Sequence, residues 1–114
     1  MTQLVTEFYD LNMLFEQVGK EETSLQRFVE IFLNTVPADM ETLKSSIANN
    51  DFNRVRSSAH KMKSSYMLMG AEWAKELCFK METIAKAEQE TEKLPELFGE
   101  LLSNFNKMVK LLRS

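Results

Sequence analysis

The sequence contains few of the residues that interrupt helices. Its 114 residues include 3 glycines and 2 prolines, about 4% in total, where an average soluble chain carries roughly 12% of the two. Leucine and methionine, with 14 and 8 residues, outnumber the 9 valines and isoleucines, which favour strands. Few turns and many helix-forming side chains together predict an all-α domain.

Cysteine and histidine occur once each. Cys78 has no partner for an internal disulfide, and there is no paired-cysteine metal site, so a reducing compartment, the cytoplasm, is expected. A bundle that holds a metal or haem in its core needs Glu-x-x-His pairs or a second ligand beside the histidine, and the sequence has neither. We therefore expect this domain to bind no cofactor and no metal.

Long apolar runs and an excess of positive charge are also missing. No stretch approaches the ~18 apolar residues of a transmembrane helix, and residues 1–7 contain no basic and apolar leader. The 14 basic and 17 acidic residues give a formal charge of -3, whereas proteins that bind the nucleic-acid backbone are usually basic. No glycine-rich phosphate loop is present. These absences predict a domain that binds no membrane, no nucleic acid and no ATP, and that is therefore not an ATP-dependent kinase.

Capping and stop residues divide the chain into five helical segments. Asp10 and Asp51 are candidate N-caps, and Gly19 and Gly70 are candidate stops. Pro37 either kinks or splits the second segment, because proline lacks an N–H and clashes with the preceding turn. The predicted helices run from Leu11 to Val18, from Thr23 or Ser24 to the turn at Asn49, from Phe52 to Met69, from Trp73 to about Glu88, and from Thr91 to Leu112.

The helix expected at 52–69 shows the clearest buried stripe. Its apolar residues recur at steps of three and four, the spacing of one face of an α-helix. They are Phe52, Val55, Ala59, Met62, Tyr66 and Met69. Four long amphipathic helices with short connections pack most simply as an antiparallel four-helix bundle, here with a short additional N-terminal helix. We predict a single domain over residues 1–114.

The only histidine, His60, lies one residue past this stripe. At about 100° per residue it falls at the edge of the buried face, partly packed and partly in water. Arg56, Lys63 and Met67 share its flank at steps of three and four. Residues 51–71 carry four cations and one acid, a formal +3 in a chain of -3, so the surface around the histidine is locally positive.

This arrangement suits a phosphoryl acceptor. A neutral imidazole is a nucleophile at physiological pH, and a phosphoryl group on it brings roughly two negative charges to the helix. Lys63 one turn later and Arg56 one turn earlier are placed to offset that charge. The small Ser57 and Ser64 leave space for a partner to approach. The alternative is that His60 is an ordinary boundary residue on a solvated, positive face.

The segment around the histidine resembles a known family. It reads Ala59-His60-Lys61-Met62-Lys63-Ser64-Ser65-Tyr66-Met67-Leu68-Met69-Gly70-Ala71. This string is similar to the A-H-x-L-K-G-S-S-x-x-x-G-A pattern of histidine-containing phosphotransfer (HPt) domains. The larger departures are Ser64, where glycine is usual, and Tyr66, where serine is usual. Helix count and lengths agree over nearly the whole chain, so the resemblance covers the full domain.

The resemblance implies roles for four side chains. His60 would be phosphorylated at Nε2, and Lys63 would be the charge partner of that phosphate. Ser64 stands where a glycine lets the receiver domain approach closely. Glu82, 22 positions after the histidine, stands where some members carry a glutamine that hydrogen-bonds the imidazole or its phosphate. A carboxylate there can accept an imidazole N–H but would repel the phosphorylated form.

The resemblance also implies the partners. Receiver domains of a hybrid histidine kinase and of a response regulator would exchange the phosphoryl group with this domain, with Mg²⁺ held by the receiver. Met67 and Leu68 are expected to contact the receiver, since methionine suits adaptable contacts. Leu11, Leu14 and Phe15 either join that docking patch or cover one end of the bundle. We expect a monomer. The competing function is a helical adaptor that binds a receiver or another signalling partner without being phosphorylated.

Overall fold

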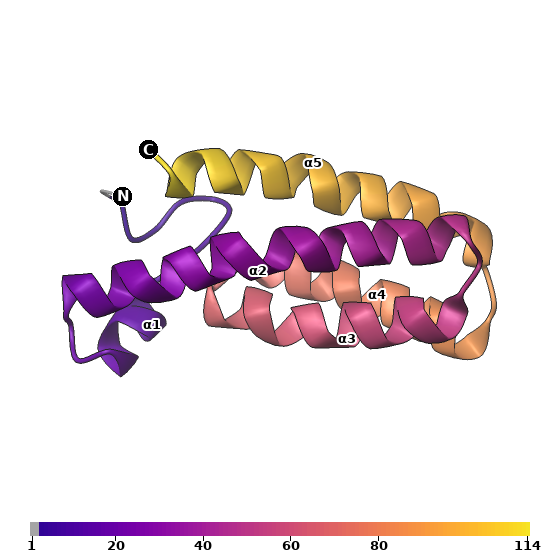
Figure 1. The fold of residues 1–114 in the computed structure, drawn as a ribbon, viewed down its shortest axis with the longest axis horizontal. Helices are drawn as coiled ribbons and strands as arrows, with labels where there is room; N and C mark the ends of the chain where they lie inside the picture. The colour runs from indigo at the N-terminus through magenta and orange to yellow at the C-terminus, as the bar shows by residue number, and fades with distance from the viewer. Residues whose placement is uncertain (1–2) are drawn as a thin grey trace.

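A computed structural model describes residues 3–114 as a set of helices joined by short connections (Figure 1). In chain order the helices are α1 (Asn12–Gln17), α2 (Glu22–Ala48), α3 (Phe52–Leu68), α4 (Glu72–Ala87), the 3₁₀ turn η1 (Thr91–Lys93) and α5 (Leu94–Leu112). Of the residues that the structure describes, 79% are helical and none lies in a strand. The predicted all-α class is confirmed.

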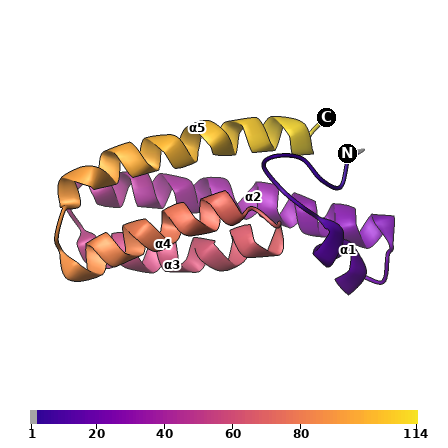
Figure 2. The same cartoon turned by 180° about the vertical axis from the view of Figure 1, so that it is seen from behind.

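The four long helices run alternately in opposite directions (Figure 1, Figure 2). α3 packs most extensively against α4, and α5 contacts both α4 and α2, which closes the bundle. α1 lies beside the N-terminal end of α2, at the same end of the molecule as the two chain termini (Figure 1). The predicted antiparallel four-helix bundle with a short N-terminal helix is therefore confirmed. No helix within residues 3–114 is long and apolar enough to cross a membrane.

α3 lies between the two residues that the sequence predicts as its N-cap and its stop. The Asp51 carboxylate accepts the backbone N–H of Arg54 at 3.2 Å and so caps the first turn. Gly70 follows the helix with a φ of 64°, a left-handed conformation that favours glycine. A Cβ at Gly70 would also overlap the backbone of Asp10, so the space at this turn admits only glycine.

The stripe predicted for α3 lies in the core. Val55, Ala59, Met62, Tyr66 and Met69 are fully buried, and Phe52 packs against the core while partly exposed. These residues share one hydrophobic cluster with side chains of all five α-helices. Burial of this cluster fixes the rotation of α3 about its axis and therefore fixes which of its side chains face solvent.

The N-terminal helix is shorter than predicted. α1 begins at Asn12, so Leu11 is its N-cap and the assignment of Asp10 to that position was wrong. The Asp10 carboxylate still accepts the Asn12 N–H, at 3.0 Å, from one position further out. At the other end of the chain, residues 91–93 form the turn η1, and α5 begins only at Leu94.

α2 differs from the prediction at its start and at its proline. The helix begins at Glu22, earlier than expected, with Glu21 as its N-cap, and the Ser24 hydroxyl donates to the Glu21 carboxylate instead of capping the backbone. The helix runs unbroken through Pro37, so the alternative in which proline splits it was wrong. Val36, next to the proline, is fully buried, and this tertiary packing holds the helix together where one backbone hydrogen bond is missing.

Candidate functional site

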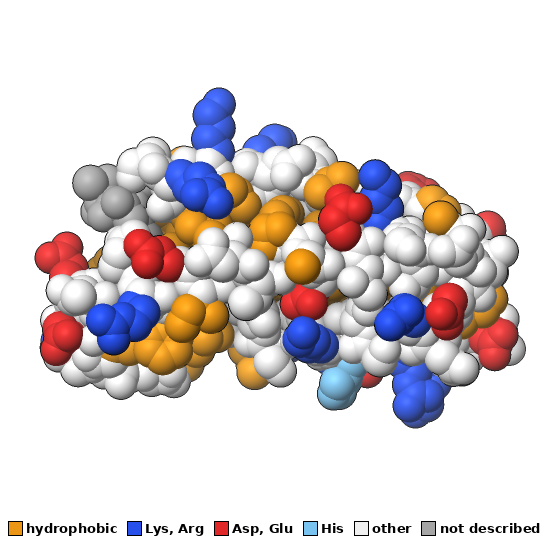
Figure 3. All heavy atoms as spheres, in the orientation of Figure 1, with side chains coloured by type: hydrophobic (Ala, Val, Ile, Leu, Met, Phe, Trp, Pro, Cys, Tyr) orange, Lys and Arg blue, Asp and Glu red, His pale blue; other side chains and the backbone are white. Residues whose placement is uncertain are grey.

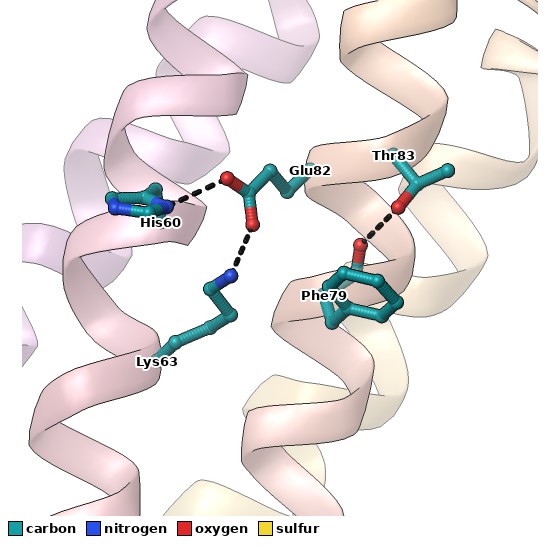
Figure 4. Close-up of polar contacts among 5 residues, drawn as sticks. All are labelled: His60, Lys63, Phe79, Glu82 and Thr83. Carbon is teal, nitrogen blue, oxygen red and sulfur yellow. Dashed lines mark hydrogen bonds and ion pairs between the residues drawn. The ribbon is translucent and has the colours of Figure 1, made fainter.

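His60 projects from the middle of α3 and is bonded to α4. Its side chain is 69% exposed, and its Nδ1 lies 2.7 Å from Oε2 of Glu82 (Figure 4). The second ring nitrogen, Nε2, points away from Glu82. Ser64, one turn later on α3, is exposed beside it. The contact with α4 therefore orients the imidazole and leaves Nε2 accessible.

Glu82 also pairs with Lys63. The Lys63 ammonium lies 2.6 Å from Oε1 of Glu82, and the two side chains are 23% and 17% exposed. Oε1 itself is buried and makes no well-aligned hydrogen bond within residues 3–114. The ion pair with Lys63 therefore compensates the cost of burying this charged oxygen. One carboxylate thus bridges His60 and Lys63 across the α3–α4 interface (Figure 4).

The ionisation of Glu82 determines which nitrogen of His60 carries the proton. Burial by itself would raise the pKa of Glu82, but the close contacts and positive charges of Lys63 and His60 outweigh it and hold the pKa below its ordinary value. Glu82 is therefore ionised at neutral pH and can only accept a hydrogen bond. Nδ1 then carries the ring proton, and the lone pair of the neutral ring lies on the accessible Nε2.

Two further cations adjoin the histidine. A hollow of about 310 Å³ is lined by Arg56, Ser57, His60, Glu82 and Lys86. The structure therefore brings Arg56 to the site, as the helical spacing predicts. Lys86 is missing from the sequence-based prediction, although it lies one turn after Glu82 on the same helix, a spacing that could have revealed it. No group of three or more His, Cys, Asp or Glu side chains in the described part of the chain is arranged to hold a metal ion.

The residues predicted to dock a partner fall into two groups. Met67 and Leu68, near the end of α3, are 51% and 39% exposed. Leu11 and Leu14 are 0% and 1% exposed, so the alternative in which they join a docking patch was wrong. They belong to the core, because the N-terminal segment and α1 turn these side chains toward the rest of the bundle. Phe15 is partly buried and lines a hollow against the start of α2, so it too helps to cover this end of the bundle.

Two exposed apolar residues on α2 are missing from the predicted site. Phe28 is 41% and Ile31 is 52% exposed. The rings of Phe32 and Tyr66, with centroids 5.8 Å apart, place this part of α2 beside the end of α3. Figure 3 shows hydrophobic side chains at the surface of the face on which the pale-blue histidine is visible. The sequence could not identify Phe28 and Ile31 as surface residues, because apolar residues on an amphipathic helix are expected to be buried.

The comparisons with known proteins agree with this geometry. Residues 27–114 match the family model of the Hpt domain. No curated protein sequence matches the chain significantly. Among solved structures, the fold is similar to histidine-containing phosphotransfer protein B from Pseudomonas aeruginosa PAO1, with a TM-score of 0.85 and 19% identity over 96% of this chain and 94% of that one. It is also similar to the HPT domain of an Hpt sensor hybrid histidine kinase from Shewanella, with a TM-score of 0.78 and 19% identity over 94% and 92% of the two chains.

The family match covers most of the bundle, including α3 with His60 and α4 with Glu82. HPt domains interact with receiver domains in phosphorelays. On this evidence, the chain belongs to the Hpt domain family, the phosphotransfer proteins of two-component signalling.

Proposed function

We propose that His60 accepts a phosphoryl group at Nε2 from the aspartyl phosphate of one receiver domain and passes it to the aspartate of another. The observation that carries this proposal is the 2.7 Å contact between Nδ1 and Glu82. It orients the ring, keeps the proton on Nδ1 and leaves Nε2 as the nucleophile on a side chain that is 69% exposed. The domain is then an intermediate carrier between a hybrid histidine kinase and a response regulator, in the cytoplasmic compartment that the free Cys78 predicts.

The transfer needs few groups from this chain. The Nε2 lone pair attacks the phosphorus, an N–P bond forms, the bond from phosphorus to the aspartyl oxygen breaks, and the aspartate leaves as a carboxylate. The phosphorylated ring keeps its Nδ1 proton and carries positive charge, which the Glu82 carboxylate offsets. In the second transfer the other aspartate attacks the same phosphorus, and the ring leaves as neutral imidazole. Mg²⁺ held by the receiver would neutralise charge on the phosphoryl oxygens.

The charges around His60 suit a phosphoryl group at Nε2. Arg56 and Lys86 line the hollow beside the ring, and Lys63 lies one turn further along α3. Glu82 would repel a phosphate, but it lies on the Nδ1 side of the ring, while Nε2 points the other way (Figure 4). The carboxylate therefore acts on the ring proton more strongly than on the phosphate, because the electrostatic repulsion falls with distance.

We infer that the receiver docks on the exposed apolar residues of α2 and α3 together. This docking surface consists of Phe28, Ile31, Met67 and Leu68. Exposed apolar groups beside a reactive residue mark an interaction site, and Met67 and Leu68 follow His60 by about two turns on the same helix. The exposed, small Ser64 leaves room for a receiver to bring its aspartate close to Nε2. All of these groups lie on one copy of the chain, so the proposed docking needs only a monomer.

The direct test is phosphorylation by a receiver. Wild-type protein is incubated with a phosphorylated receiver and Mg²⁺, and the product is examined for acid-labile, alkali-stable phosphate. We expect wild type and Asn53→Ala, an exposed substitution elsewhere on α3, to acquire phosphate and His60→Gln to acquire none. Equal labelling of His60→Gln would overturn the proposal. If wild type stays unlabelled and both proteins bind the receiver equally well, the domain is the unphosphorylated adaptor instead.

A further inference from the structure

Phe79 is a large aromatic residue in an exposed position on α4. Its side chain is 57% exposed, and it is not part of the docking surface. The Lys63 ammonium lies 5.2 Å from the centroid of its ring, within the range of a cation–π contact. Phe79 precedes Glu82 by three residues, so both side chains project from α4 toward the same lysine of α3 (Figure 4). The ring lies outside the hydrophobic core cluster.

Lys63 is thus held from two directions. Its ammonium binds Oε1 of Glu82 at 2.6 Å and contacts the Phe79 ring at 5.2 Å. This position lies on the Nδ1 side of His60, because Oε2 of the same carboxylate binds Nδ1. Nε2 points away from Glu82 (Figure 4). A phosphate on Nε2 would therefore lie on the opposite side of the imidazole from the Glu82 carboxylate that binds the ammonium.

We propose that Phe79 is a positioning residue that holds Lys63 in this resting position, and that phosphorylation of His60 draws the ammonium from Phe79 and Glu82 to the phosphate. This inference rests on the proposed function. The more strongly the ring holds the ammonium, the less Lys63 stabilises the phosphohistidine relative to the aspartyl phosphate of the receiver. Phe79 therefore sets how readily the domain gives up its phosphoryl group.

An aromatic ring is suited to this task because it is neutral. A second carboxylate in its place would hold the ammonium more strongly, but it would also repel the incoming phosphate. The face of a phenyl ring attracts a cation through its quadrupole and adds no net negative charge. The Lys63 side chain is 23% exposed, so part of it already faces the solvent from which a stronger anion would approach.

The resting position is tested first, in the unphosphorylated protein. Phe79→Leu keeps an apolar side chain but removes the aromatic face, whereas Phe79→Trp keeps the face. In NMR spectra, we expect the Lys63 side-chain protons nearest the ammonium to be shifted upfield by the ring in wild type and in Phe79→Trp, and to return to ordinary positions in Phe79→Leu. Both variants should fold, because Phe79 is exposed. A Lys63 spectrum that is unchanged in Phe79→Leu overturns the proposal without reference to phosphotransfer.

The release of Lys63 is tested by the phosphoryl equilibrium between His60 and a receiver aspartate. We expect Phe79→Leu to shift it about two- to fivefold toward phosphohistidine, the factor that corresponds to a partly exposed cation–π contact. Phe79→Trp should cause no such shift. In a Lys63→Met background, Phe79→Leu should have no effect on the equilibrium.

Three results of this second measurement would count against the proposal. An equal shift in the Lys63→Met background means that Phe79 does not act through Lys63. A change in receiver affinity with an unchanged equilibrium makes Phe79 a docking residue. A wild type that takes no phosphate refutes the proposed function and the phosphorylation-driven release with it, while the NMR comparison separately decides whether Phe79 holds Lys63.

Discussion

The two faces of α3 have opposite roles within a single turn of helix. On one face, Met62 and Tyr66 are fully buried. On the other, the His60 side chain is 69% exposed and is bonded to Glu82 of the neighbouring helix. A rotation of about 100° per residue is enough to separate them. The difference shows how a bundle keeps a reactive side chain in water without loosening its core.

The contacts on the two faces also differ in kind. Tyr66 packs by its ring against Phe32 and Phe105, with centroids 5.8 and 6.3 Å apart. Burial raises the pKa of Tyr66 far above its ordinary value, so this residue stays neutral over the whole physiological range. The exposed face depends instead on the charges of Glu82 and Lys63. Substitutions should therefore affect stability on the buried face and phosphoryl chemistry on the exposed face.

The largest expected effect comes from placing the same charge on each face in turn. Met62→Asp removes a fully buried side chain, a loss of about 2–5 kcal/mol when methionine is truncated in a core, and buries a carboxylate in its place. Because domains are stable by only about 5–15 kcal/mol, we expect this variant to be unfolded. Met67→Asp, at a position 51% exposed, should melt within a few degrees of wild type. Thermal unfolding by circular dichroism makes the comparison, and equal melting temperatures would show that α3 is rotated differently.

The next largest effect is expected at Gly70, where the buried face meets the N-terminal segment. Gly70→Ala forces a left-handed backbone at about 1–2 kcal/mol and displaces the Asp10 backbone as well. Gly99→Ala is the matched control, since Gly99 lies in α5 with open space around it, and alanine there should stabilise by about 0.5–1 kcal/mol. Urea unfolding should give opposite signs for the two variants. A neutral Gly70→Ala would mean that residues 9–11 do not pack against this turn.

Much of the fold could be predicted because it depends on local signals. The spacing of apolar residues and the capping groups Asp51, Gly19 and Gly70 lie within a few positions of the helices that they define. The continuity through Pro37 could not be predicted, since it depends on the tertiary packing of Val36. The start of α2 was missed although Ser24 and Glu21 are close in the sequence. The sequence also left two alternatives open for Leu11 and Leu14, because apolar periodicity does not distinguish a side chain that covers the core from one that binds a partner.

The candidate site was predictable along α3 and less so across helices. His60, Lys63 and Arg56 follow from the spacing of one helix, and Lys86 could have been found from its spacing to Glu82. Phe79 joins them only through the packing of α4 on α3. The departure from the HPt pattern at Tyr66 is also explained by tertiary structure. Its side chain fills the core beside Trp73, with ring centroids 6.2 Å apart, and takes no part in the site.

The smallest expected effect tests whether the contacts on the exposed face of α3 contribute to the stability of the folded protein. Glu82 is 17% exposed and paired with Lys63, and its pKa is held below the ordinary value of 4.5. A carboxyl group whose pKa is lowered on folding stabilises the folded state above its unfolded pKa, and this stabilisation is lost as the pH falls through the folded pKa. Glu82→Gln should therefore melt slightly below wild type at neutral pH, with the difference shrinking below about pH 4.5.

The matched control for this pH dependence is Glu100→Gln, which removes one negative charge from an exposed position on α5. The measurement is the melting temperature of the three proteins between pH 7 and pH 2. The expectation fails if the difference in melting temperature between wild type and Glu82→Gln stays constant down to the lowest pH, or if Glu100→Gln shows the same decrease. Either result would mean that the carboxylate bridge between His60 and Lys63 makes no specific contribution to folding. A gap that closes only for Glu82→Gln shows that the exposed face stabilises the fold through one carboxylate. Glu82 would then have two roles, because the carboxylate that orients His60 for phosphotransfer also stabilises the packing of α3 against α4.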